Sequence, residues 1–102
     1  MEVSHRQEGT IAYVQIVGHV DEKGAERLEN YFQQLELSKL TEVVMDFSQV
    51  TRIGSAGIGQ MLLLYKNLAM GGGTIRLEHV SHNLHELFKV LKLDTLFTIT
   101  RN

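Results

Sequence analysis

Strand-like apolar runs alternate with segments of helical periodicity along this chain, and this alternation constrains the fold more than any other feature. Residues 10–17 place Ala12, Val14 and Ile16 on a fully apolar face and a mixed set of side chains on the other, which is typical of a strand. Residues 74–78 alternate apolar and polar side chains, as a half-buried strand does. Residues 43–47 form a nearly continuous apolar run, typical of a strand buried on both faces. Because helices are expected between these strands, the strands should run largely parallel with right-handed crossovers. The predicted fold class is α/β, with a mixed, mostly parallel sheet.

Both ends of the chain add strand signals to this sheet. Residues 3–7 can pair with residues 10–17 across a Glu8-Gly9 turn, which gives an antiparallel hairpin at one edge. We expect Gly18 to end the second of these strands. A last short strand over residues 96–100 would bring the sheet from four strands to five.

Three helices are expected between and after the strands. Asp21 and Ser81 are the predicted N-caps of the first and third, because their side-chain oxygens can accept hydrogen bonds from first-turn amides. The first helix should end near Ser38, and the second should run from Ser55 to the glycine run at 71–73. The predicted core-facing positions recur at helical spacing: Ala25, Leu28, Phe32 and Leu35; Ile58, Met61, Leu62, Tyr65 and Leu68; Leu84, Leu87, Phe88 and Leu91.

Length and composition restrict the class of protein. The chain has 102 residues, which fits a single domain over residues 1–102. Its net charge is −2 and its basic residues are scattered, so we expect no nucleic-acid partner. It has no cysteine, which excludes disulfides, thiolate metal sites and thiol nucleophiles.

The hydropathy pattern gives no targeting or membrane segment. The first residues are polar, unlike a signal peptide, and the longest apolar run, residues 61–65, is far too short to span a bilayer. We therefore expect a cytoplasmic protein without direct membrane insertion.

One glycine-rich segment, residues 54–59, has the glycine spacing of a phosphate-binding loop. Gln60 and Met61 follow it, where such a loop needs lysine and a hydroxyl residue. Leu62 stands where the dinucleotide-binding pattern needs its third glycine. A nucleotide-binding enzyme is therefore the least favoured function.

Other polar clusters also lack the pattern of a catalytic or metal site. Histidines recur at positions 79, 82 and 85, but their polar neighbours favour an exposed helix surface over a metal site. Asp21, Asp46 and Asp94 are expected at the ends of elements, where caps and turns explain them. No histidine lies near Ser55 in the sequence to act as a base. We expect no enzyme activity, no cofactor and no metal.

The most informative stretch is residues 43–68. A buried strand is followed by Asp-Phe-Ser-Gln-Val-Thr at residues 46–51 and then by Ile-Gly-Ser-Ala-Gly-Ile-Gly at residues 53–59. Residues 49–54 are the predicted connecting loop between the strand and the helix that Ser55 opens. This resembles the STAS domains, the family of bacterial anti-sigma factor antagonists, in which an Asp-Ser-Ser-Gly or Ser-Ser-Ala-Gly type sequence opens a helix. Gly-His-Val-Asp at residues 18–21 and the glycines before residue 74 also resemble the family.

The resemblance implies helices packed mainly on one side of the sheet and a function by partner switching. In that scheme the unmodified protein binds a serine kinase that doubles as an anti-sigma factor, and phosphorylation at the helix start separates the complex. Ser55 is then the candidate phosphorylation site. The candidate partner-binding residues are Asp21, Arg52, Gly54, Ser55, Ala56, Gly57 and Gln60.

Two alternatives stay open at this point. Ser55 could serve only as an N-cap, with Gly57 and Gly59 allowing close packing. Gly54 and Ala56 also stand where the family's motif has polar residues. If the residue that is phosphorylated in the family is the second hydroxyl of Asp-Ser-Ser-Gly, this chain has Ala56 there and cannot be phosphorylated at that position. Some STAS proteins are accessory subunits of membrane lipid transporters, with a helix start Asp-Thr-Ala-Gly that Ser-Ala-Gly also resembles. The oligomeric state is not predicted.

Overall fold

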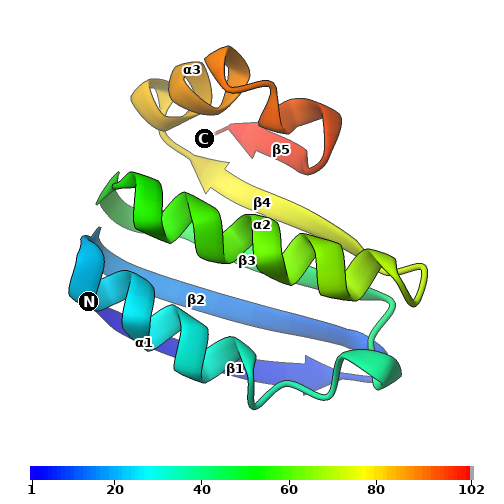
Figure 1. Cartoon of the computed structure of the whole chain (residues 1–102). Helices are drawn as coiled ribbons and strands as arrows, with labels where there is room; N and C mark the ends of the chain where they lie inside the picture. Colours follow the sequence, from blue (N-terminus) through cyan, green and yellow to red (C-terminus); the bar gives the residue numbers. More distant parts are fainter. Residues whose placement is uncertain (102) are drawn as a thin grey trace.

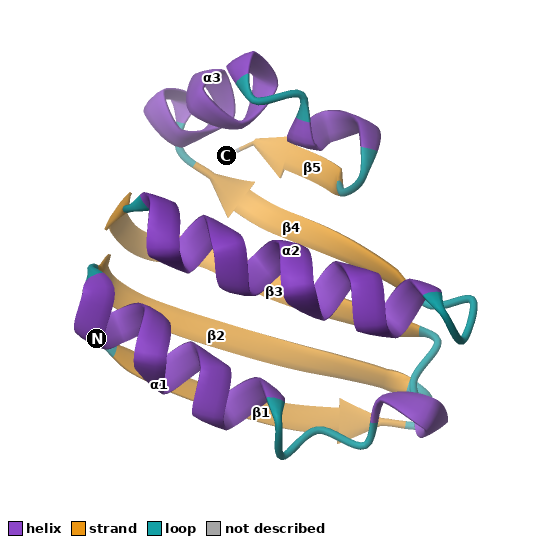
Figure 2. Cartoon of the chain, viewed as in Figure 1, coloured by secondary structure: helices purple, strands orange, loops and turns teal. Residues whose placement is uncertain are grey.

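The computed structural model describes residues 1–101 and has one five-stranded sheet covered on one face by helices (Figures 1 and 2). In chain order the elements are β1 (Glu2–Glu8), β2 (Ile11–Val20), α1 (Glu22–Phe32), the 3-10 turn η1 (Leu37–Lys39), β3 (Glu42–Ile53), α2 (Ser55–Ala69), β4 (Thr74–Val80), α3 (His82–Val90), the 3-10 turn η2 (Leu93–Thr95) and β5 (Thr98–Arg101).

The strands lie side by side in their sequence order. β1 pairs antiparallel with β2, and the β2–β3, β3–β4 and β4–β5 pairs are parallel. Gly9, with φ +61°, makes the hairpin turn between β1 and β2. The predicted α/β class and mostly parallel sheet are therefore confirmed, as is the placement of the helices on one face.

The hydrophobic core lies between the helices and the sheet. Phe47 of β3 and Phe88 of α3 are fully buried and meet edge to face, with ring centroids 5.9 Å apart. Tyr65 of α2 and Phe97 pack in the same way at 5.8 Å. No polar or charged residue is buried within residues 1–101. At the level of single atoms, Nδ1 of His85 is buried and has no hydrogen-bond partner among the described residues.

Two strands run further than the sequence predicted. β2 continues through Gly18 to Val20, and the segment predicted as a loop, residues 49–54, belongs to β3 as far as Ile53. Two shifts in the β2–β3 register explain this, because such irregularities let paired strands continue past a residue that breaks regular geometry. Gly18 lies at one of them with φ +106°, a conformation open to glycine. Asp46, predicted at an element end, is consequently inside β3.

The helices differ from prediction at their ends and edges. α1 stops at Phe32, well before Ser38, and the chain turns towards β3. Leu64 of α2 is buried, although it was not among the predicted core positions. Leu87 and Leu91 were predicted to face the core, but they are 36% and 46% exposed because α3 lies at the end of the helix layer (Figure 1). No helix within residues 1–101 is long and apolar enough to cross a membrane.

Candidate functional site at the start of α2

All three α-helices begin at the same edge of the sheet (Figure 1). β2, β3 and β4 run parallel, and each ends immediately before the N-cap of a helix. The N-caps are Asp21, Gly54 and Ser81. First-turn amides and the positive ends of three helix dipoles are therefore gathered at one edge.

The three caps differ in what they offer to the first turn. Oδ1 of Asp21 accepts a hydrogen bond from the Gly24 amide at 2.8 Å, and Oγ of Ser81 accepts one from the Leu84 amide at 3.3 Å. Gly54 has no side chain, so α2 has no side-chain cap. Among the α-helices of residues 1–101, α2 alone begins with an uncapped first turn.

Ser55 is the first residue of α2, and its side chain is exposed. The alternative in which Ser55 serves as the N-cap is therefore wrong, since Gly54 holds that position. The first intrahelical bond runs from the Ile58 amide to the Gly54 carbonyl, at 3.1 Å. The amides before Ile58 have no intrahelical acceptor, which favours a negative group at the helix start. Ala56, the next residue, is also exposed.

Gly57 is buried and fixes how closely α2 approaches the sheet. A Cβ at this position would lie 2.7 Å from Cγ1 of Val20 and 2.9 Å from Cγ1 of Ile53, the last residues of β2 and β3. Gly59 has nothing within 4 Å of the corresponding position. The predicted close packing therefore holds for Gly57 and not for Gly59. Gly57 positions the helix start and has no side chain to contact a partner.

Gln60 lies one turn further along α2 and is half-buried. Its Nε2 donates to Oε2 of Glu29 on α1 at 3.4 Å. This contact ties α2 to α1 beside the helix start, so Gln60 belongs to the junction of the two helices.

Charged side chains surround the uncapped helix start. Arg52 is exposed near the end of β3, in register with exposed His19 on β2. The hydrogen bond from the Gly24 amide lowers the pKa of Asp21 below its ordinary 3.8, and the charge of His19 adds to this against the opposing effect of desolvation. His19 was not among the predicted site residues, although the Gly-His-Val-Asp element that contains it was a signal that could have found it.

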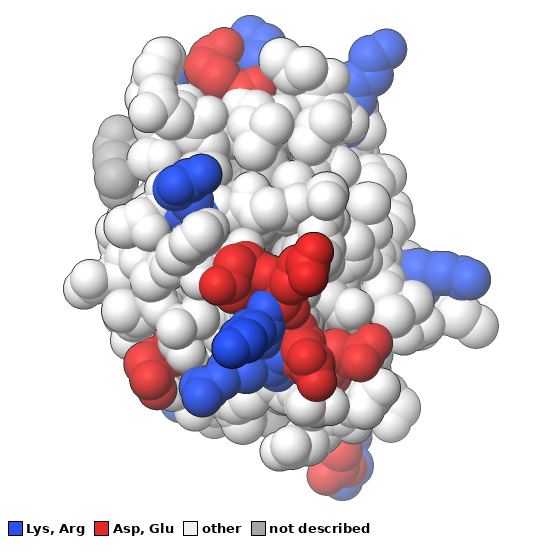
Figure 3. All heavy atoms as spheres, turned by 60° about the vertical axis from the view of Figure 1, so that its left-hand side comes forward, with Lys and Arg blue, Asp and Glu red and all other residues white. Residues whose placement is uncertain are grey.

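Figure 3 turns this edge of the molecule towards the reader. Acidic and basic side chains gather into one mixed cluster in the lower half, and a broad uncharged surface lies above it. α1 supplies exposed charges of both signs: Glu22, Lys23, Glu26 and Arg27. In contrast, Lys66 is the only charged residue in α2. A partner that covers the start of α2 therefore meets a largely neutral helix beside a charged one.

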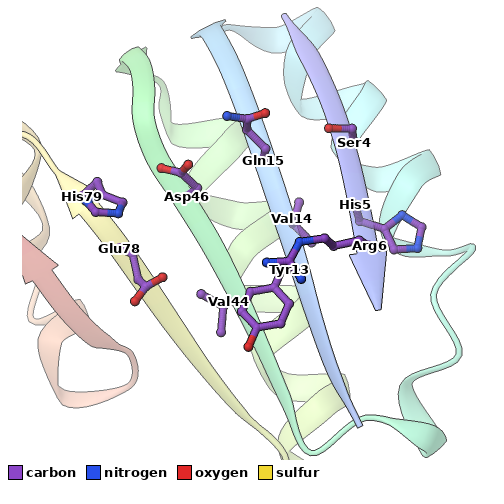
Figure 4. A pocket seen from close by; sticks show the side chains of 10 residues that line it. All are labelled: Ser4, His5, Arg6, Tyr13, Val14, Gln15, Val44, Asp46, Glu78 and His79. Carbon is purple, nitrogen blue, oxygen red and sulfur yellow. The ribbon is translucent and has the colours of Figure 1, made fainter. Parts of the chain in front are cut away.

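A separate hollow of about 450 Å³ lies on the face of the sheet that carries no helix (Figure 4). Asp46 and Glu78 are aligned on neighbouring strands, and the guanidinium of Arg6 stacks 4.3 Å from the ring centre of Tyr13. No cluster of three or more His, Asp or Glu side chains within residues 1–101 is placed to hold a metal ion.

Comparison with known proteins identifies the family. A family model described as "Mlab, STAS domain" matches residues 3–99. The chain belongs to the STAS domain family. The resemblance seen in residues 43–68 is thereby confirmed.

Solved structures show that this STAS fold occurs in several settings. An anti-sigma factor antagonist from Mycobacterium paratuberculosis is 19% identical, with TM-score 0.85 over 99% of this chain and 86% of that one. The phosphorylated form of the Bacillus cell fate determinant SpoIIAA is 14% identical, with TM-score 0.77 over 99% and 93%. A sulfate transporter family protein from Wolinella succinogenes is 17% identical, with TM-score 0.73 over 85% and 71%. At these identities the likeness concerns the fold.

Proposed function

We propose that this STAS protein is an anti-sigma factor antagonist-like regulator that works by binding other proteins. Its partner in this proposal is a serine kinase that doubles as an anti-sigma factor. The partner covers the start of α2, and phosphorylation of Ser55 releases it. The observation that carries the proposal is the exposed Ser55 hydroxyl at the one α-helix, within residues 1–101, whose first turn has no side-chain cap.

The contact surface is formed by the exposed residues around this position. Gly54, Ser55 and Ala56 present a small, neutral surface that a partner can approach closely. Arg52 and Asp21 add one charge of each sign at the same edge of the sheet, where they can set the orientation of the partner. Gly57 lets α2 pack closely on the ends of β2 and β3 beneath this surface, and Gln60 holds α2 against α1 through its hydrogen bond to Glu29.

Phosphorylation would change this surface in two ways. It would add about −1.5 to −2 charges at neutral pH to a position that docked while neutral. The phosphate oxygens could accept hydrogen bonds from the open amides before Ile58, which stabilises the modified helix start in the free protein. Docking would then have to desolvate the phosphate and break these bonds. Both effects favour dissociation of the modified protein.

Incubation with the cognate kinase and ATP, followed by intact-mass measurement, tests the assignment. We expect one phosphate on the wild type and none on Ser55→Ala, with both proteins binding the kinase before ATP is added. Ala56→Ser is the matched control, because it adds a hydroxyl at the next exposed position. A phosphate that remains in Ser55→Ala, or a cognate kinase that neither binds nor modifies the wild type, would contradict the proposal.

A second candidate is an accessory subunit of a membrane lipid transporter ATPase. It is favoured by Ser55-Ala56-Gly57, which resembles the Asp-Thr-Ala-Gly helix start of such subunits. In that role the same surface clamps an ATPase and needs no phosphorylation. Affinity purification from detergent-solubilised membranes distinguishes the two candidates. Recovery of a transporter ATPase with Ser55→Ala as readily as with the wild type would favour this second function.

A further inference from the structure

A groove lies beside the C-terminal half of α2, where α2 runs on past the end of α1 (Figures 1 and 2). α1 has 11 residues and α2 has 15, and after α1 the chain turns through residues 33–36 to η1. The resulting hollow, which we call the α1–α2 groove, has a volume of about 320 Å³. Its apolar lining comes from both helices and the turn between α1 and η1: Phe32, Leu35, Leu37, Leu63 and Leu64.

The apolar lining of the α1–α2 groove reaches from the core to the surface. Leu64 is only 2% exposed, whereas Leu63, the residue before it, is 46% exposed. An inserted side chain would therefore meet apolar surface at the bottom of the groove and at its rim. A concave apolar hollow of this kind is typical of a surface that binds protruding side chains of another molecule.

One charge marks the α1–α2 groove. Among the described residues, Glu29 is the only charged one that lines it, and it is half-buried. Its Oε2 accepts the hydrogen bond from Nε2 of Gln60 at 3.4 Å, but a neutral amide leaves the negative charge uncompensated and the carboxylate can accept further bonds. Glu29 forms no ion pair within residues 1–101. The groove therefore holds an unpaired carboxylate against an apolar wall.

The end of α1 makes the same place more negative. The last turn of α1 has no basic residue, whereas the last turns of α2 and α3 have Lys66 and Lys89. The negative end of the α1 dipole is therefore not offset by a cation of its own helix. Both features favour a positive group in the α1–α2 groove.

The neighbouring lysines leave this place open. Lys66 is exposed on α2 and does not line the groove. Lys39 of η1 is paired with Glu36 at 2.9 Å, and neither residue lines the groove. The remaining lining side chains are neutral amides, which can both donate and accept hydrogen bonds with a peptide backbone: Gln33, Gln60 and Asn67.

We propose that the α1–α2 groove binds a peptide segment of a partner protein in which a lysine or arginine stands beside a large aliphatic residue. The cation pairs with Glu29, and the aliphatic side chain packs against Phe32 and Leu63. An acidic segment would set like charges together, and a purely apolar one would desolvate Glu29 without pairing it, which costs free energy. Ser55 lies outside the groove, so this docking does not depend on its modification.

Titration of the isotope-labelled protein with the peptide acetyl-Leu-Arg-Leu-amide, followed by NMR, tests the proposal. We expect saturable shifts of the side-chain amide signals of Gln33, Gln60 and Asn67, with a Kd of about 1 mM because the contact is small. Acetyl-Leu-Glu-Leu-amide is the matched control peptide. It should give no saturable shift of these signals, because its carboxylate would face Glu29.

Two pairs of variants separate the charge from the apolar contact. Glu29→Gln, which keeps the side-chain length, should weaken binding of the arginine peptide about fivefold. Glu26→Gln is its control, because Glu26 is exposed on the same helix and does not line the groove. Leu63→Ser should also weaken binding, whereas Met70→Ser should not, since Met70 is 81% exposed and lies outside the groove.

Three results would overturn the proposal: no saturable shift with the arginine peptide up to about 10 mM, equal affinity for the glutamate peptide, and an affinity that Glu29→Gln leaves unchanged. Ser55→Ala should bind the arginine peptide like the wild type, and the titration needs no kinase. Failure of this proposal is therefore distinguishable from failure of the phosphorylation proposal.

Discussion

The position of Ser55 depends on Gly57, and replacing Gly57 with alanine tests that dependence. The helix start approaches the sheet so closely that a new Cβ would lie 2.7 Å from Val20 and 2.9 Å from Ile53. The contacting Cγ1 atoms belong to short, branched, buried side chains, which cannot swing away as the end of a long side chain could. To accommodate the methyl group, α2 would have to move outward and carry Ser55 with it.

Gly59→Ala supplies a reference that isolates this steric effect. Both substitutions replace a helical glycine with alanine, which by itself stabilises a helix by about 1 kcal/mol. Overpacking at a buried site costs about 1–3 kcal/mol, and it applies only at Gly57, because the space beside Gly59 is open. Gly57→Ala should therefore be neutral or destabilising by up to about 2 kcal/mol, whereas Gly59→Ala should be stabilising. The helix-propensity effect cancels in the comparison, which leaves a difference of about 1–3 kcal/mol.

Thermal unfolding followed by circular dichroism measures this difference. In a domain of this size about 1 kcal/mol shifts the Tm by roughly 4–8 °C. Gly59→Ala should therefore melt at least about 4 °C above Gly57→Ala. Equal melting temperatures, or a higher value for Gly57→Ala, would refute the conclusion that contact with the ends of β2 and β3 fixes the start of α2.

Three further substitutions test the helix starts. Asp21→Asn keeps a capping oxygen and removes the charge. Because folding lowers the pKa of Asp21, its carboxylate stabilises the fold above its ordinary pKa of 3.8, and this stabilisation is lost as the pH falls through the folded-state pKa. Urea unfolding at a series of acidic pH values should therefore show a shallower loss of stability in the variant. Ser81→Ala removes the acceptor for the Leu84 amide and should cost about 1 kcal/mol in denaturant unfolding. Gly54→Ser gives α2 a capping side chain and should raise the free energy of unfolding by a few tenths of a kcal/mol in the same measurement. The site has room for it, because only the Val20 carbonyl oxygen, at 3.8 Å, lies near a new Cβ. A loss of stability in this variant would contradict the description of α2 as an uncapped helix.

Features encoded in short stretches of sequence were predictable. The caps at Asp21 and Ser81, the turn at Gly9 and the helix start at Ser55 each depend on residues within a few positions of one another. The family resemblance also came from such a stretch, the one around Ser55. These signals were sufficient for the fold class and for the place of the candidate site.

Features set by contacts between distant segments were not predictable. The extension of β3 to Ile53 depends on its pairing with β2, including the irregularity at Gly18. The neighbourhood of His19 and Arg52 follows from the same register. Leu87 continues an apolar helical pattern, but the position of α3 at the end of the helix layer leaves it partly exposed. Sequence periodicity indicates which side chains are apolar, and the neighbouring elements decide which of them are covered.

The most direct test of the proposed function is the affinity of the cognate kinase for two forms of this protein, unmodified and phosphorylated on Ser55. Isothermal titration calorimetry should give a complex with the unmodified form and an affinity at least about tenfold lower for the phosphorylated form, a change of about 1.4 kcal/mol. Equal affinity for the two forms would show that the charge at the start of α2 does not control the complex, and it would contradict the proposed release of the kinase by phosphorylation.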